Sequence, residues 1–67
     1  MPFVNIKITK DGVSSKQKAI LIRGVTDLLV SVLNKNQATT VVVIEEIEPD
    51  SWGIGGESIT ARRRKGL

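Results

Sequence analysis

Two strand-like stretches flank one long helical stretch, and this order restricts the fold more than any other feature of the sequence. The first nine residues read as a strand whose apolar and polar side chains alternate from Val4 onward. Residues 39–47 form an unbroken run rich in β-branched side chains, which suits a strand covered on both faces. A strand, a helix and a second strand in one sheet form a right-handed βαβ unit. The sequence therefore predicts an α/β fold with parallel strands.

The helix between the two strands is expected to run from about residue 15 to residue 33. Ser14 and Gln17, three residues apart, fit a capping box at its N-terminus. At 100° per residue the segment has one broad apolar stripe, which we expect to face the strands. The stripe consists of Leu21, Ile22, Val25, Leu28, Leu29, Val32 and Leu33.

Three residues of this helix do not fit a simple amphipathic pattern. Ile20 and Val30 fall toward the polar face, where they are either scattered surface side chains or contacts with another subunit. Gly24 in the middle of a helix costs up to ~1 kcal/mol relative to alanine. A close approach by another backbone would justify that cost.

A glycine-rich segment follows the second strand. After a turn at residues 49–51, residues 52–56 read Trp-Gly-Ile-Gly-Gly, and such glycines indicate positive φ angles or a close backbone approach. No Gly-Lys-Ser/Thr follows and no long helix begins there, so the segment is not a phosphate loop. On spacing alone, a tight C-terminal β-hairpin whose Trp52 fills a neighbour's groove is the favoured interpretation.

The size and composition of the chain favour self-association. Its 67 residues form a single domain, residues 1–67, and a chain of this length buries only about 60% of its unfolded surface. It has no cysteine and no histidine, which excludes disulfides, thiolate metal sites and the usual general base. Yet 40% of its residues are hydrophobic. A small chain that lacks disulfides and metal sites but has this many apolar residues is expected to be an oligomer.

The positive charge is concentrated at the C-terminus. The net charge is +3, but residues 62–65 carry four positive charges, so the remaining six lysines and arginines against seven acids give −1. We expect residues 62–67 to form a flexible basic tail. With Phe3 and Trp52 as the only aromatic residues there is no stacking platform, so we expect no nucleic-acid partner. Neither a signal peptide nor an apolar run of membrane-spanning length is recognisable, so we expect a cytoplasmic protein without membrane contact.

Pro2, directly after the initiator methionine, is the candidate catalytic residue. Methionine aminopeptidases remove Met1 before a proline, which would expose a secondary amine held stiffly by its ring. An α-amino group has a pKa of about 7.7 to 8, and burial beside apolar side chains lowers it. An amine that is partly neutral near pH 7 can act as a general base. The alternative is that Pro2 is merely a proline tolerated at the start of a strand.

Pro2, the βαβ spacing and the Trp-Gly-Ile-Gly-Gly hairpin together resemble the 4-oxalocrotonate tautomerase family, from Pro2 to about Ile59. This resemblance implies a tautomerase-like fold in which strands are exchanged between subunits, commonly a homohexamer built as a trimer of dimers. It makes Pro2 the catalytic base and acid. It puts Trp52 where the family usually has phenylalanine, in an apolar pocket together with Ile54. It implies no cofactor and no metal.

The chain departs from the family at two positions that bind substrate carboxylates. The family's arginines before the helix and early in the second strand align with Val13 and Val41. Loss of a buried charge partner typically costs 2 to 5 kcal/mol, so a dicarboxylate is expected to bind poorly. Lys10, Lys35 and the tail arginines of a neighbouring subunit are the candidate replacements.

The sequence thus predicts an isomerase that interconverts the enol and keto forms of a small 2-oxo acid. A second enzymatic hypothesis is a hydratase or dehalogenase on the same scaffold, which would need Glu46 or Glu48 in the pocket to activate water. A third is a partner or structural subunit that keeps the fold with weak activity, and the missing arginines favour it.

Overall fold

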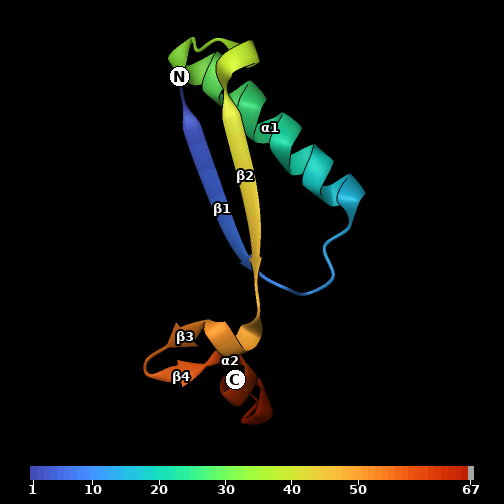
Figure 1. Ribbon diagram of the computed structural model, residues 1–67, viewed down its shortest axis with the longest axis vertical. Helices are drawn as coiled ribbons and strands as arrows, with labels where there is room; N and C mark the ends of the chain where they lie inside the picture. The colour runs from blue at the N-terminus through green and yellow to red at the C-terminus, as the bar shows by residue number, and fades with distance from the viewer. Residues whose placement is uncertain (67) are drawn as a thin grey trace.

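The computed structural model describes residues 1–66 and has two regions joined by a short connection (Figure 1). None of the helices in these residues is long and apolar enough to cross a membrane. Along the chain, the first region contains β1 (Phe3–Thr9), α1 (Ser15–Leu33), the 3-10 turn η1 (Gln37–Thr39) and β2 (Val41–Ile47). The second contains the 3-10 turn η2 (Pro49–Ser51), β3 (Gly53–Ile54), β4 (Glu57–Ser58) and α2 (Ile59–Arg64).

The predicted βαβ unit is confirmed. β1 and β2 pair in parallel, with a register that runs from Phe3 opposite Val41 to Thr9 opposite Ile47. α1 runs back along one face of this two-stranded sheet, so that the chain returns to the start of β1 before it enters β2 (Figure 1). The predicted C-terminal hairpin, β3 with β4, is also present and is antiparallel.

Both ends of α1 are set by local hydrogen bonds. The capping box is formed as predicted: Ser14 Oγ accepts from the Gln17 backbone N–H at 3.1 Å, and Gln17 Oε1 accepts from the Ser14 N–H at 2.9 Å. At the other end, Asn34 adopts the left-handed conformation, with φ 53°, and its N–H donates to the Val30 carbonyl. A left-handed residue closes a helix in this way because it satisfies one of the last carbonyls.

The sheet is covered on one face only, which corrects the expectation that the second strand is buried on both. Every second residue of β1 from Val4 to Ile8 is half-buried beneath α1, whereas Phe3 and Lys7 on the opposite face are exposed. Glu46 of β2 lies on the covered side, where its carboxylate is 3.4 Å from the Lys18 ammonium of α1. One helix can cover only one face of a sheet, so a second layer has to come from elsewhere.

The described residues of a single chain form no closed hydrophobic core. Within residues 1–66 only Thr26 is buried, and no hydrophobic side chain is. The radius of gyration is 15.3 Å, whereas a compact chain of this length has about 11 Å. The helix stripe is accordingly only partly used: Val25 and Leu29 are half-buried, but Leu28 and Val32 are 60% and 67% exposed. Leu33 is also 53% exposed, so the expectation that the whole stripe faces the strands is wrong for these three residues.

The C-terminal region lies beyond the end of the β1–β2 ladder. Its hairpin turns at Gly55 and Gly56, with φ 61° and 88°, as a two-residue turn with two positive φ angles requires. Residues 62–64, which we expected to belong to a flexible tail, form the last turn of α2. Ser58 caps this helix by accepting from the Ala61 N–H at 3.1 Å. Leu67, the end of the predicted tail, lies outside the described residues.

Candidate active site

Pro2 stands at the open end of the sheet. Its carbonyl accepts from the Val41 N–H at 3.0 Å, which extends the parallel ladder by one bond beyond Phe3. Pro2 is half-buried, while Phe3 and Val41 beside it are 66% and 40% exposed. Met1 projects into solvent, 91% exposed. The backbone of Pro2 is therefore fixed at the end of the sheet, next to two residues whose apolar side chains are exposed.

Trp52 and Ile54, the other two predicted site residues, belong to the segment from η2 to β3, which lies beyond the opposite end of the ladder (Figure 1). Trp52 is half-buried and follows η2, and its carbonyl accepts from the Ile59 N–H at 2.8 Å. Ile54 is 46% exposed in β3. The seven residues of β1 alone span about 23 Å. Within one chain, then, Pro2 does not meet Trp52, and the expectation that the two are neighbours fails for the single chain.

The two positions that resemble the family's arginine sites are separated in the same way. Val41 is at the Pro2 end of the sheet, whereas Val13 is half-buried at the other end, just before α1. Val13 lines a shallow hollow of about 330 Å³ together with Gln17, Ile20 and Leu21. This hollow is almost entirely apolar, so it can accept an aliphatic or aromatic group and offers no charge to a carboxylate.

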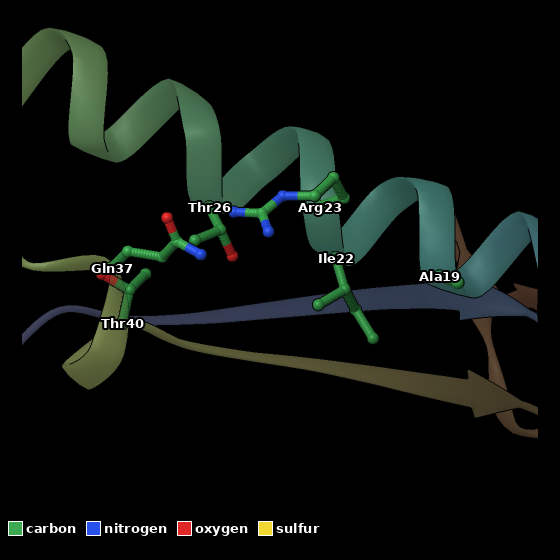
Figure 2. Close-up of a pocket in the computed structure, with 6 residues that line it drawn as sticks. All are labelled: Ala19, Ile22, Arg23, Thr26, Gln37 and Thr40. Atoms are coloured by element: carbon green, nitrogen blue, oxygen red, sulfur yellow. The ribbon is translucent and has the colours of Figure 1, made fainter.

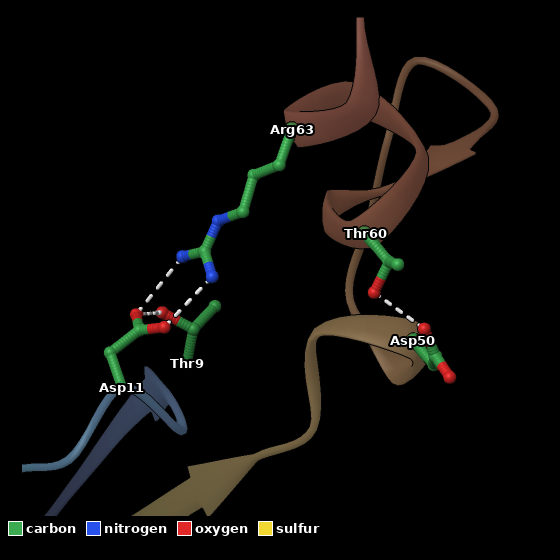
Figure 3. A network of polar contacts seen from close by, with 5 residues as sticks. All are labelled: Thr9, Asp11, Asp50, Thr60 and Arg63. Carbon is green, nitrogen blue, oxygen red and sulfur yellow. Dashed lines mark hydrogen bonds and ion pairs between the residues drawn. The ribbon is translucent and has the colours of Figure 1, made fainter. Parts of the chain in front are cut away.

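The structure brings one arginine to this loop from a distant part of the sequence. Arg63 of α2 donates from Nη1 to Asp11 Oδ1 at 2.9 Å and from Nη2 to Oδ2 at 3.1 Å, in a fork-to-fork pair (Figure 3). The Thr9 hydroxyl also donates to the Asp11 carboxylate. The hydrogen bonds from Arg63 and then from Thr9 hold the pKa of Asp11 below its usual value. Nearby, the Thr60 hydroxyl donates to Asp50, which ties α2 to η2.

The side chain of a second arginine, Arg23 of α1, lies near the segment that leads into β2. Arg23 donates from Nε and Nη2 to Asp27 Oδ1 at 3.1 and 2.7 Å. With its amide oxygen turned toward the guanidinium, Gln37 accepts from it at 3.2 Å. A hollow of about 450 Å³ opens here, lined by Ala19, Ile22, Arg23, Thr26, Gln37 and Thr40 (Figure 2). Thr40 directly precedes Val41, so this cation is on the side of the molecule where β1 begins.

The carboxylates needed for a hydratase are not next to Pro2 in the chain. Glu46 pairs with Lys18 beneath α1, opposite Ile8 rather than Pro2 in the register. Glu48 pairs with Lys10 at 3.3 Å, at the far end of the ladder. Lys10, a candidate replacement for the missing arginines, is therefore also far from Pro2. Among residues 1–66, no three acidic side chains come together as a metal site.

Comparison with known proteins identifies the family. Residues 2–62, from the candidate catalytic proline to the middle of α2, match the family described as "Tautomerase enzyme". This chain belongs to the tautomerase family. A "Probable tautomerase" of Dickeya dadantii is 68% identical over 65 residues, which cover 97% of each chain.

Two solved structures have the same fold. DmpI of Helicobacter pylori is 48% identical and superposes with a TM-score of 0.88, covering 94% of this chain and 97% of its own. TomN, a 4-oxalocrotonate tautomerase homologue of tomaymycin biosynthesis, is 26% identical with a TM-score of 0.90, covering 98% of this chain and all of its own (100%). The resemblance to the 4-oxalocrotonate tautomerase family is thus confirmed, and this tautomerase is an isomerase.

The sequence analysis missed the ion pairs that Arg23 and Arg63 form in this tautomerase. The i, i+4 spacing of Arg23 and Asp27 was a usable signal for the pair between them. Arg63 was expected in the tail. Its partner, Asp11, is 52 residues away in the sequence, and no local pattern links them.

Proposed function

We propose that Pro2 is the general base and acid of a keto–enol tautomerisation, and that removal of Met1 exposes its amine. The position of Pro2 supports this proposal most directly: its backbone carbonyl is held by the Val41 hydrogen bond at the end of a strand, next to two residues with exposed apolar side chains. Such neighbours favour the neutral amine once a second layer excludes water. The sequence has no histidine or cysteine to compete for the role.

In the proposed reaction one proton moves between oxygen and carbon of the substrate. The lone pair of the Pro2 nitrogen accepts the enol hydroxyl proton, and the oxygen electrons form the carbonyl double bond. The electrons of the carbon–carbon double bond then take up the proton from the Pro2 ammonium at carbon. The amine ends neutral, as it began, so the protein needs no other reactant. A base positioned in this way typically contributes 10²- to 10⁴-fold to the rate.

The proposed site is shared between copies of the chain in a homohexamer. Pro2 of one copy would meet Trp52 and Ile54 of another, because the length of the ladder keeps them apart within one chain. The uncovered face of the sheet and the absence of a core among residues 1–66 support such an assembly. Sedimentation should show a stable oligomer at micromolar concentration, and a folded monomer would contradict the proposal.

The proposed substrate is the enol of a small 2-oxo acid with one carboxylate. Valine at positions 13 and 41 supports this choice, because neither side chain can pair with a second carboxylate. The apolar hollow beside Val13 suits an aliphatic or aromatic substituent. Dicarboxylate enols should therefore be poorer substrates than aromatic monocarboxylate enols.

The variant Pro2→Ala tests the central role. It keeps a free amine but loses the ring, so kcat/KM for ketonisation of an aromatic 2-oxo acid enol should fall at least ~100-fold. Circular dichroism and sedimentation of the variant should match those of the native protein. Equal rates for the two proteins would remove Pro2 from the mechanism.

A second variant separates the amine from the ring. A lysine inserted between Met1 and Pro2 keeps the ring in place but prevents removal of Met1, which intact-mass measurement verifies. The Pro2 nitrogen is then an amide without basicity, so activity should fall at least as far as in Pro2→Ala. Activity at the native level in this insertion variant would show that the amine is not the base.

A further inference from the structure

Part of the Arg63 guanidinium is not used by its ion pair with Asp11. An arginine side chain carries five N–H groups in one plane. Arg63 donates to Asp11 with one N–H of Nη1 and one of Nη2, so the two terminal nitrogens face the carboxylate (Figure 3). Within residues 1–66, the Nε–H of Arg63 has no acceptor, and Nη2 has a further N–H beside it. We call Nε and Nη2 of Arg63 the side fork.

The side fork has the geometry that binds a carboxylate. Pairs between arginine and a carboxylate are frequently bidentate, with two N–H groups of the guanidinium donating together. The same two nitrogens of Arg23, Nε and Nη2, donate to Asp27 Oδ1 at 3.1 and 2.7 Å elsewhere in this chain. The Arg63 side chain is 51% exposed, so a small anion can reach it.

Arg63 is held in place from two sides. Its pair with Asp11 fixes the end of the side chain, and α2 fixes the backbone. The Ile59 N–H donates to the Trp52 carbonyl at 2.8 Å, and the Thr60 hydroxyl ties α2 to η2. Arg63 is one helical turn after these two residues and therefore lies on the same side of α2. A guanidinium ordered in advance loses little side-chain entropy when it binds a ligand.

An apolar hollow lies beside the loop that holds Arg63. Asp11 is two residues before Val13, which is one of the residues that line the hollow of about 330 Å³. Cα atoms two residues apart are separated by at most about 7.6 Å. Lys10, the other cation of this loop, is already paired with Glu48. Arg63 thus places a positive charge next to a hollow that has none of its own. A carboxylate joined to an apolar group by a short chain of atoms suits this combination.

We propose that Arg63 binds the carboxylate of the substrate through its side fork. Asp11 holds the other part of the guanidinium, and the hollow beside Val13 takes the apolar substituent. The inference rests on the function proposed above, because the ligand is the same 2-oxo acid enol. In such an enol the carboxylate and the substituent are bonded to the two carbons of the double bond. Holding both ends leaves the reacting carbons between them, open to the Pro2 amine of another copy.

A pair of substrates measures the contribution of Arg63. The enol of an aromatic 2-oxo acid and the enol of its methyl ester differ in the charge of the group that Arg63 binds, and native protein should have the higher kcat/KM for the acid. Arg63→Gln should lower the ratio of the two kcat/KM values about tenfold to 100-fold, as expected for hydrogen bonds to a charged group. Loosening of α2 would affect both substrates and cancel in the ratio. An unchanged ratio would overturn the proposal.

Two further variants separate the side fork from the positive charge. Arg64→Gln removes the same charge at the next residue of α2, which is exposed, and should leave the ratio at its native value. Arg63→Lys keeps the charge and can still pair with Asp11, but an ammonium group offers no second fork, so the ratio should still fall several-fold. A native ratio in Arg63→Lys, or an equal fall in Arg64→Gln and Arg63→Gln, would show that the side fork does not bind the substrate.

Binding of an unreactive carboxylate separates this inference from the chemistry at Pro2. Phenylacetate has a carboxylate and an aromatic ring but no enol, so its binding requires no base. Its dissociation constant, followed by the fluorescence of Trp52, should rise about tenfold or more in Arg63→Gln and stay at the native value in Pro2→Ala. Phenylacetamide, the neutral control, should bind native protein and Arg63→Gln equally.

The two proposals can therefore fail separately. Equal binding of phenylacetate to native protein and Arg63→Gln would refute the carboxylate site, even where Pro2→Ala has lost its activity. Binding that depends on Arg63, in a protein whose Pro2→Ala variant is fully active, would support the carboxylate site and refute the role of Pro2.

Discussion

The βαβ unit and the C-terminal region are held together in different ways. In the βαβ unit, a seven-residue parallel ladder and a capped nineteen-residue helix form continuous secondary structure. In the C-terminal region, each hairpin strand has two residues and α2 has six. Elements this short depend on side chains: Arg63 with Asp11, Thr60 with Asp50, and Lys65 with Glu57.

The difference indicates that the two regions have different roles. A parallel ladder beneath a helix keeps its geometry through backbone hydrogen bonds, and it fixes Pro2 at one end. Exposed ion pairs are worth little individually, so the C-terminal region is free to adapt to a neighbouring subunit. We expect the βαβ unit to determine stability and the C-terminal region to determine the pocket.

The largest effect that separates the two regions is expected at Trp52. Trp52→Ala should leave the βαβ unit folded and the oligomer intact, but admit water to the Pro2 amine and raise its pKa. At pH 7 each unit of that rise in pKa lowers the fraction of neutral Pro2 amine about tenfold, so kcat/KM should fall about tenfold or more. The pH profile of kcat/KM measures the shift. Dissociation of the oligomer with an unchanged profile would mean that Trp52 only fills a groove.

A smaller effect is expected at the capping box of the βαβ unit. Ser14→Ala removes the hydroxyl that accepts from Gln17, and the loss of such a cap typically costs about 1 kcal/mol of folding stability. Urea unfolding of the variant checks this value. The corresponding cap of the short helix α2, Ser58, is the matched comparison. If Ser58→Ala destabilises the protein as much as Ser14→Ala, the hypothesis that the βαβ unit determines stability is wrong.

The smallest effect is expected from acid. Because the pKa of Asp11 is lowered in the folded protein, its pair with Arg63 stabilises the folded protein at pH values above the unfolded pKa of about 3.9. That contribution is lost as the pH falls through the still lower folded value. α2 should then separate from the loop before the βαβ unit unfolds, seen as a fluorescence change of Trp52, the single tryptophan. Asp11→Asn should show the acid-separated state already at pH 7, whereas Asp27→Asn, which removes an exposed ion pair within α1, should show the same Trp52 fluorescence as the native protein.

Several features could be predicted from the sequence because their causes are local. The capping box at Ser14 involves residues three apart, and the turn at Gly55 and Gly56 follows from residues that accept positive φ angles. The alternation around Val4 and the β-branched run after Thr39 were enough to predict parallel strands. Pro2 was recognised as a candidate because a proline after Met1 has one distinctive chemical property, a secondary amine.

Other features were decided only by the tertiary structure, because they depend on where distant segments end in space. The direction and length of β1 place Pro2 and Trp52 at opposite ends of the ladder, although both contribute to the resemblance to one family. The pairing of Arg63 with Asp11 joins residues 52 positions apart. Periodicity showed which side of α1 is apolar, but one small sheet can cover only part of that stripe, and this left Leu28 and Val32 exposed.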